Sequence, residues 1–300
     1  MCDDYAGQGH GADIGGADAR SSGISGGLSR REFAAFGTAA ALTGCAGGVG
    51  QASAQGDLNE RMVEITTKDG LADAFFVHPA KGAHPGVVMW PDIAGLREAK
   101  KVMARRLAAA GYAVLCVNPY YRGGPAPIME SFSEFRTPEG QAKVKPLRAA
   151  LTPSAISSDA AAYVGFLDGD AAVDKARKIG SNGYCMGGPF TVRTAAAAPG
   201  RVGAAASLHG GGLVTPDADS PHRLLAATQA SYLFAIARND DAQDPAVKDQ
   251  LRAAADAAKR PAEIEVYAAD HGWTVPDSPA YDPVEADRAW QRMLALFGKL

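Results

Sequence analysis

The chain has 300 residues, of which 47% are apolar and 21% charged, with a formal net charge of −3. This is the composition of an ordinary globular protein that is long enough to bury a large core. Without an excess of basic residues, we expect no nucleic-acid partner. The six histidines lack metal-ligand spacing, and the four cysteines are too scattered for a disulfide scaffold or a CxxC site: Cys2, Cys45, Cys116 and Cys185. We therefore expect no metal and no other cofactor.

Residues 1–54 are interpreted as lying outside the folded domain. Residues 1–27 are rich in Gly, Ser, Ala and Asp, and we expect them to be disordered. Arg30 and Arg31 then precede a short, weakly apolar run at 34–42. A twin arginine ahead of such a run resembles a twin-arginine export signal.

Two processing signals follow this run. Cys45 ends a Leu-Thr-Gly-Cys stretch that resembles a lipoprotein signal, and Ala54 ends an Ala-Ser-Ala stretch that resembles a signal-peptidase site. The interpretation is an exported protein, either periplasmic or lipid-anchored at Cys45, with membrane contact only through that anchor. The alternative is a short amphipathic helix in a cytoplasmic protein.

From residue 58 onward, apolar runs alternate with segments of helical period. Strands are predicted at 63–66, 74–77, 86–90 and 112–117, around 179, and at 202–208, 231–237 and 264–267. Helices are predicted at 97–110, from Ser154 or Ser157 to 166, after Cys185, at 245–259 and at 284–300. Residues 120–153, rich in Pro and Gly, are predicted to be a connection with a short helix that lies over the sheet end. Within it, residues 123–153 are expected to shape the pocket.

This alternation predicts an α/β fold, a single doubly wound and mostly parallel sheet with helices on both faces, formed by residues 58–300. Ligands of such folds bind at the carboxyl ends of the strands. The pattern shows no internal repeat and no linker that would divide this part in two, and we expect a monomer.

The most informative motif is Gly183-Tyr184-Cys185-Met186-Gly187, which follows a predicted buried strand and precedes an Ala-rich helix. This is the layout of a nucleophile elbow, in which the glycines avoid clashes of the tight turn with neighbouring backbone. The start of the helix favours a thiolate at Cys185. The alternative is a buried structural cysteine beside a glycine-rich turn.

A thiol nucleophile needs a base and an acid that orients it. His271, just after the last predicted strand, is the predicted base. Asp240 follows the strand before it and is the predicted acid, with Asp241 as the alternative and a turn or helix-capping role left for the other. His209, at another strand end, is predicted to line the pocket, whereas His222 is interpreted as a surface residue.

The oxyanion of the reaction needs two backbone donors. The N–H groups of Met186, after the nucleophile, and Ile93, after the first long buried strand, are the predicted pair. Asp92 is expected to point toward the thiol, or alternatively to cap the following helix.

These residues resemble the dienelactone hydrolase family of α/β-hydrolases over residues 62–300. Cys185, Asp240 and His271 match its nucleophile, acid and base. The resemblance implies a single α/β-hydrolase domain that cleaves enol-lactones or related esters through a cysteine acyl-enzyme.

The resemblance also implies residues that contact the substrate or the thiol. Asp92 stands where family members place a glutamate that contacts the thiol, and Arg122 matches an arginine that binds the substrate carboxylate. The position of the family's second carboxylate-binding arginine is Val275 here. Independently of the resemblance, four further residues near the predicted site are expected to contact the substrate or the thiol: Tyr120, Tyr184, His209 and Trp273.

The function expected from the sequence is hydrolysis of small carboxylic esters or lactones by a Cys-Asp-His triad. One alternative is a non-catalytic binding protein on the same scaffold. The other is a thiol redox protein in which Cys185 cycles through sulfenic acid. No resolving cysteine lies near Cys185 in sequence, and Cys116 is predicted to be buried in a strand.

Overall fold

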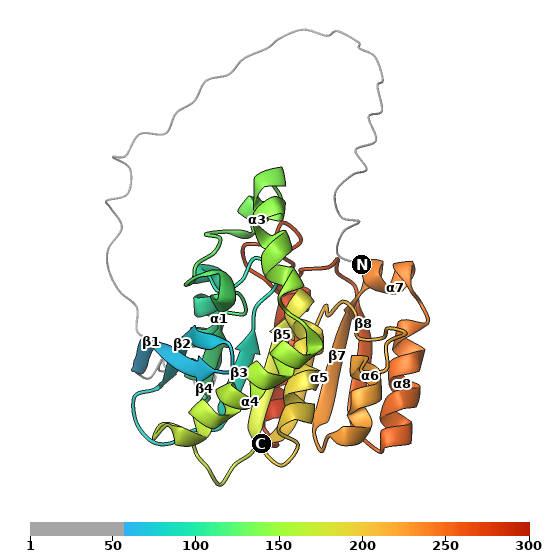
Figure 1. The fold of residues 1–300 in the computed structure, drawn as a ribbon. Coiled ribbons are helices and arrows are strands. Elements are labelled where there is room, and N and C mark those ends of the chain that lie inside the picture. Colours follow the sequence, from blue (N-terminus) through green and yellow to red (C-terminus); the bar gives the residue numbers. More distant parts are fainter. Residues whose placement is uncertain (1–56) are drawn as a thin grey trace, which may run out of the picture. The chain divides into compact units, whose positions relative to one another are not determined.

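The computed structural model describes residues 57–300, through which runs an eight-stranded sheet in the order β1-β2-β4-β3-β5-β6-β7-β8 (Figure 1). The disorder, export signal and processing sites predicted within residues 1–54 lie outside the described residues. The strands are β1 (Leu58–Thr67), β2 (Gly70–Pro79), β3 (Gly86–Trp90), β4 (Ala113–Val117), β5 (Ile179–Tyr184), β6 (Val202–Leu208), β7 (Ser231–Ala237) and β8 (Ala262–Tyr267).

The sheet is parallel from β4 to β8, and only the β1–β2 and β2–β4 pairs are antiparallel. Every residue of β3, β4 and β5 is buried. Such continuous burial is expected where helices cover both faces of a parallel sheet. The predicted doubly wound, mostly parallel α/β fold is therefore confirmed.

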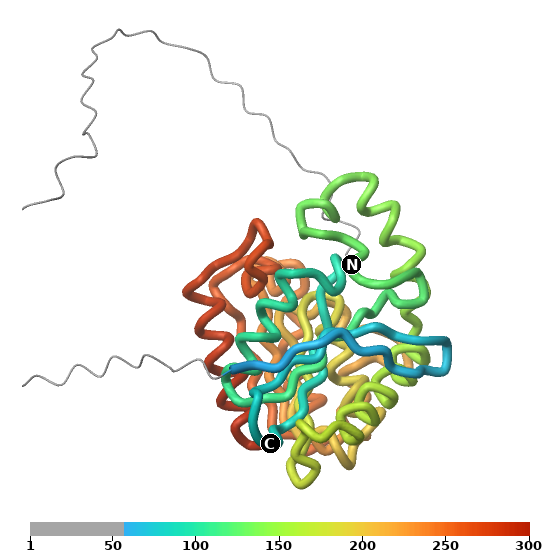
Figure 2. The backbone as a smooth tube through the Cα atoms, turned by 90° about the vertical axis from the view of Figure 1, so that its left-hand side faces the viewer, coloured from blue at the N-terminus to red at the C-terminus, as the bar shows by residue number. Residues whose placement is uncertain are grey.

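The helices divide between the two faces of the sheet. Core residues of α1 and α9 pack on one face, and those of α4, α5 and α8 pack on the other (Figure 2). The α-helices are α1 (Glu98–Ala109), α2 (Phe132–Phe135), α3 (Pro138–Ala149), α4 (Pro153–Gly169), α5 (Gly188–Ala197), α6 (Pro221–Leu224), α7 (Arg238–Gln243), α8 (Val247–Ala258) and α9 (Pro283–Phe297). Short 3₁₀ turns are η2 (Tyr121–Gly123), η3 (Cys185–Gly187) and η4 (Leu225–Ala227). None of the helices within residues 57–300 is long and apolar enough to cross a bilayer.

The connection after β4 is more helical than predicted. It holds η2, α2 and the 12-residue α3, whose weak apolar period and internal Pro146 conceal it in the sequence. The N-cap of α4 is Thr152, whose side chain accepts a hydrogen bond from Ala155 N–H at 3.2 Å. The caps predicted at Ser154 or Ser157 are therefore wrong, because Pro153 is suited to the first helical position.

The carboxyl ends of the parallel strands define one edge of the sheet, near α3 and α7 in Figure 1. Pro91, Cys185, His209 and Arg238 directly follow β3, β5, β6 and β7 at this edge. The residues that carry the predicted chemistry are thus brought together from segments far apart in the sequence.

Candidate active site

Cys185 sits in a strained turn directly after β5. Its φ is +53°, in the left-handed region that a non-glycine residue rarely adopts. A Cβ on Gly183 would lie 2.1 Å from the Gly187 carbonyl oxygen, and one on Gly187 would lie 2.5 Å from the Pro91 carbonyl oxygen. Both glycines are therefore required by backbone packing, which supplies the steric reason for the Gly-x-Cys-x-Gly motif.

The turn continues through η3 into α5, so the cysteine precedes the N-terminus of a helix. A Cβ on Gly188 would lie 2.5 Å from Gly210 Cα, which shows how closely the segment after β6 approaches the elbow. The other thiol among the described residues, Cys116, is fully buried in β4, and this burial raises its pKa to about 12. Cys116 belongs to the core on the opposite face of the sheet from Cys185, and it is not placed to resolve a Cys185 disulfide.

His271 follows β8 and is oriented from α7. Its Nδ1 atom lies 2.7 Å from Asp240 Oδ2, and its backbone N–H donates to Asn239 Oδ1 at 2.8 Å. Asp241 instead pairs with Lys248 at 2.6 Å. The structure thus brings Asp240, and not its neighbour, to the histidine, although Asp240 lies in a short helix rather than in the expected loop. Sequence reasoning missed the contact between Asn239 and His271. The position of Asn239 directly before Asp240 could have suggested it.

His209 is fully buried against His271. Its Nε2 lies 2.8 Å from Thr274 Oγ1, and its ring centroid is 5.0 Å from that of His271 and 5.1 Å from that of Trp273. Burial, and then the proximity of His271, hold the pKa of His209 well below its usual range, so its imidazole is neutral near pH 7. Its φ of +42° shows that the chain also turns sharply here.

The Pro91–Gly95 segment, which follows β3, is called here the oxyanion loop because it contains Ile93. Ile93 N–H has no hydrogen-bond acceptor among the described residues. The Tyr120 hydroxyl donates to the Ile93 carbonyl oxygen at 2.8 Å and lies 3.3 Å from the Met186 sulfur. Tyr120 therefore braces the two residues whose N–H groups are the predicted oxyanion donors.

Asp92 is held within the loop and by α1. Its Oδ1 accepts hydrogen bonds from Ala94 N–H at 3.0 Å and from Arg97 Nη1 at 2.8 Å, and its Oδ2 lies 2.8 Å from Lys100 Nζ. Burial would raise the pKa of Asp92, but Lys100 and Arg97 outweigh it and hold that pKa well below its usual range. Within the described residues, neither oxygen bonds to Cys185, which sequence reasoning expected Asp92 to face.

Arg122 is bound by two carboxylates. Its guanidinium donates to Asp69 Oδ2 at 2.6 and 3.0 Å and to Asp159 at 2.8 and 2.9 Å. The spacing of the two aspartates in the sequence gives no indication that they pair with this arginine. Val275, at the family's second arginine position, is 1% exposed.

Tyr184 and Trp273, predicted to contact substrate or thiol, pack into the core on the α1 and α9 side of the sheet, away from the core that contains Cys185. The Tyr184 hydroxyl accepts a hydrogen bond from Asn182 at 2.9 Å, and Lys100 Nζ lies 4.3 Å from the Tyr184 ring centroid. Trp273 stacks on Tyr267 with ring centroids 5.2 Å apart. In the structure these two side chains belong to the core on the opposite face of the sheet from Cys185.

No group of three or more His, Cys, Asp or Glu residues within 57–300 is arranged to hold a metal ion. The grouping at the sheet edge is instead a cysteine in a strained strand–helix turn, a histidine after the last strand and a carboxylate bonded to that histidine. On this eight-stranded sheet, it defines a protein of the α/β-hydrolase class.

The sequence matches the dienelactone hydrolase family over residues 72–300, and the chain belongs to that family. A protein of Methylorubrum extorquens named "Putative carboxymethylenebutenolidase" is 28% identical over 236 residues, covering 77% of this chain and 78% of that protein. A Synechocystis protein of the same name is 27% identical over 246 residues, covering 80% and 97%. The chain is thus a hydrolase of this family, acting on a small molecule.

Solved structures agree on the fold. A Klebsiella pneumoniae protein described as "Putative Dienelactone Hydrolase" superposes with a TM-score of 0.69 at 24% identity, covering 81% of this chain and all of that one. A dienelactone hydrolase-like promiscuous phosphotriesterase from metagenomic libraries superposes with a TM-score of 0.67 at 23% identity, covering 82% and 99%. At such identities the likeness concerns the fold alone.

Proposed function

We propose that the protein hydrolyses carboxylic esters or lactones through an acyl-enzyme on Cys185. The observation that carries this proposal is the 2.7 Å contact between His271 Nδ1 and Asp240 Oδ2 at the edge where Cys185 is held in its strained turn. A carboxylate that accepts the Nδ1–H hydrogen bond fixes the tautomer in which Nε2 carries the lone pair that accepts a proton.

In the proposed first half-reaction, His271 Nε2 takes the Cys185 proton and the thiolate attacks the carbonyl carbon, forming a C–S bond. The N–H groups of Met186 and Ile93 hold the oxyanion of the tetrahedral intermediate. The intermediate collapses with cleavage of the C–O bond, and the departing alkoxide takes the proton from His271.

In the second half-reaction, water gives a proton to His271 and its oxygen attacks the thioester carbon. The C–S bond breaks, the acid leaves, and His271 returns the proton to the thiolate. Because a thiolate is a better leaving group than an alkoxide, activated esters and lactones suit this nucleophile better than amides.

The substrate we propose carries no carboxylate of its own. Arg122, the cation that the family resemblance assigns to this task, is engaged by Asp69 and Asp159. Arg97 and Lys100 are fully buried and paired with Asp92. An anionic substrate would therefore have to displace a resident carboxylate to bind any of these three cations.

Two assays test this function. We expect wild-type protein to hydrolyse p-nitrophenyl acetate and to show an acetyl adduct by mass spectrometry, with Cys185→Ala losing both and Cys116→Ala retaining both. We also expect kcat/KM for p-nitrophenyl butyrate to exceed that for mono-p-nitrophenyl succinate by about tenfold or more, as expected when a buried charge lacks a partner. Turnover that survives in Cys185→Ala would contradict the mechanism, and a preference for the succinate would contradict the substrate class.

A further inference from the structure

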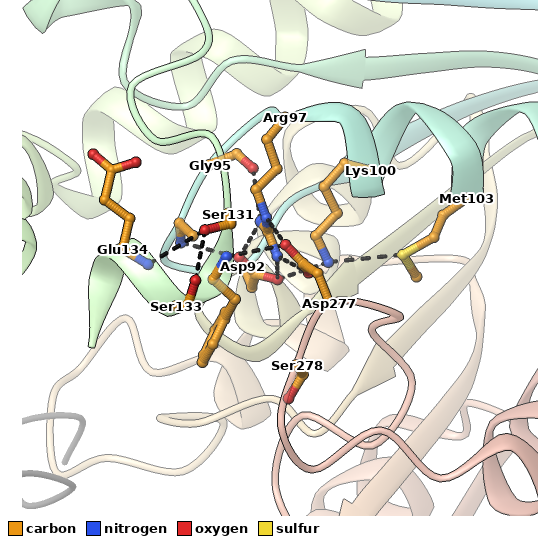
Figure 3. A network of polar contacts seen from close by, with 12 residues as sticks. Asp92, Gly95, Arg97, Lys100, Met103, Ser131, Ser133, Glu134, Asp277 and Ser278 are labelled. Atoms are coloured by element: carbon orange, nitrogen blue, oxygen red, sulfur yellow. Dashed lines mark hydrogen bonds and ion pairs between the residues drawn. The ribbon is translucent and has the colours of Figure 1, made fainter. Parts of the chain in front are cut away.

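Four charged side chains form a network between the oxyanion loop and the loop after His271 (Figure 3). The side chains of Asp92, Arg97 and Lys100 are at most 1% exposed, and that of Asp277 is 24% exposed. Two carboxylates balance two cations, so the formal charge of the network is zero. The proposed mechanism above uses none of these four side chains.

Arg97 is the centre of this network and holds the oxyanion loop at two points. Its Nη1 donates to Asp92 Oδ1 at 2.8 Å and to the Gly95 carbonyl oxygen at 3.1 Å. These two acceptors stand on either side of Ile93 and Ala94 along the chain. The position of the guanidinium therefore sets the position of the segment that presents Ile93 N–H.

The other side of the guanidinium is fixed by Asp277, six residues after His271. Arg97 Nε donates to Asp277 Oδ2 at 2.8 Å, and Nη2 donates to Asp277 Oδ1 at 2.7 Å. This two-point geometry restrains both the position and the orientation of the arginine.

Asp277 also holds α2. Its Oδ2, which already accepts from Arg97 Nε, accepts a second hydrogen bond from Phe132 N–H at 3.0 Å. Phe132 is the first residue of α2, its ring centroid lies 5.8 Å from the Arg97 guanidinium carbon, and Ser131 caps the helix. One carboxylate thus joins α2, the loop after His271 and the arginine that holds the oxyanion loop.

We propose that Arg97 and Asp277 are positioning residues that couple the seating of α2 to the geometry of the oxyanion donor at Ile93. The inference rests on the function proposed above, because it concerns the same site. When Phe132 N–H is bonded to Asp277, the carboxylate is restrained and holds Arg97, and Arg97 holds the loop on both sides of Ile93. Removing the Phe132 contact releases this restraint without touching the triad.

The backbone of Phe132 offers a sharp test. Proline is well suited to the first position of a helix, and Ser131 before it is extended, with φ −149° and ψ 162°, as a residue before proline must be. Phe132→Pro therefore removes the N–H and the ring, whereas Phe132→Ala removes only the ring. Asp277→Asn tests the carboxylate, and Arg105→Met, on the exposed side of α1, is the control for loss of an arginine ion pair.

Two reactions of Cys185 separate positioning of the donor from the state of the thiol. Acylation by p-nitrophenyl acetate passes through an oxyanion, whereas alkylation by iodoacetamide does not. We expect Phe132→Pro and Asp277→Asn to slow acylation by about 10- to 100-fold, the range associated with misplacement of catalytic groups. Alkylation should stay within about twofold of wild type, and Phe132→Ala and Arg105→Met should be acylated at nearly the wild-type rate.

Equal acylation rates for Phe132→Pro and Phe132→Ala, or a parallel fall of acylation and alkylation in Asp277→Asn, would overturn the coupling. Circular dichroism verifies that each variant is folded. Asp277→Asn tests the same coupling without a proline, and its site is partly exposed, so it provides a second test if Phe132→Pro does not fold. Wild-type protein that is alkylated but never acylated would contradict the proposed function itself, and this inference with it. Acylation of wild type that is unaffected in both Phe132→Pro and Asp277→Asn would contradict the inference alone.

Discussion

The imidazole of His209 packs against that of His271 at an interplanar angle of 61°, with ring centroids 5.0 Å apart. The two rings come from the ends of different strands, and His209 is anchored at its far side by Thr274. The ring of His209 therefore packs against the predicted base and restricts the movement of the His271 side chain.

We predict that His209→Ala lowers kcat for ester hydrolysis by about tenfold, because the space it leaves lets His271 move out of line with its partners. The change in KM should be smaller, since the variant does not alter the proposed donors or Cys185. Steady-state kinetics measure both effects. The matched control, His209→Phe, keeps an aromatic ring against His271, and its kcat should fall by less. An equal fall of kcat in both variants would show that packing of this ring does not position His271.

The same residue predicts a pH dependence of stability. Unfolded His209 binds a proton below about pH 6.5, whereas the buried folded form, with its lowered pKa, does not. The unfolded state then holds more protons, so the free energy of unfolding falls as pH decreases below about 6.5, by at most about 1.4 kcal/mol per pH unit for one group.

Urea denaturation between pH 7 and pH 5 measures this slope. His222, whose pKa is also lowered by burial, contributes in the same direction, so the informative quantity is the difference between wild type and His209→Phe. We expect a shallower slope in the variant. Identical slopes would show that His209 does not titrate in this way.

The two adjacent aspartates should differ sharply in their effect on activity. Asp240→Asn removes the carboxylate that contacts His271 Nδ1, and we expect kcat to fall by about 100-fold or more, as for triad acids in general. Asp241→Asn breaks only the ion pair with Lys248, and its kcat should stay within about twofold of wild type. The opposite order of effects would assign the acid to Asp241.

The glycines of the elbow should not tolerate a methyl group. In Gly187→Ala the new Cβ would lie 2.5 Å from the Pro91 carbonyl oxygen and 2.6 Å from that of Trp90. We expect a loss of about 1–3 kcal/mol in the free energy of unfolding, because rigid backbone must move. The control is Gly165→Ala in α4, where a Cβ meets nothing within 4 Å, and a gain of about 0.5–1 kcal/mol is expected there. Chemical denaturation compares the two, and similar stabilities would refute the packing argument.

Export remains a proposal from the sequence of residues 1–54. We expect Arg30→Lys together with Arg31→Lys, which keeps both charges, to abolish export in a bacterial host, because the signal is read as an arginine pair. Cell fractionation measures the distribution, and intact mass distinguishes an N-terminus at Gln55 from lipidation at Cys45. Equal export of both proteins would contradict the twin-arginine signal, and wild-type protein that stays in the cytoplasm would favour the cytoplasmic alternative.

Features that depend on neighbours along the chain could be predicted from the sequence. The Gly-x-Cys-x-Gly motif marks a turn whose steric demands are local, and runs of apolar residues mark strands buried on both faces. The alternation of these strands with helical segments was sufficient for the fold class. Helix α3 was missed because Pro146 and a weak apolar period hide its helical character, and the cap at Thr152 was missed because serines nearby fit the same rule.

The partners of the polar side chains were decided only by the tertiary structure. Arg97 meets Asp277 across 180 residues, and Arg122 meets Asp69 and Asp159 across 53 and 37 residues. Adjacent Asp240 and Asp241 differ in role only because α7 turns one toward His271 and the other toward Lys248. Sequence by itself determined which residue types reach the edge of the sheet, since strand and turn propensities act over a few residues. Which charges meet there depends on how distant segments pack, because hydrogen bonds and ion pairs form only between groups that the complete fold brings within about 3 Å.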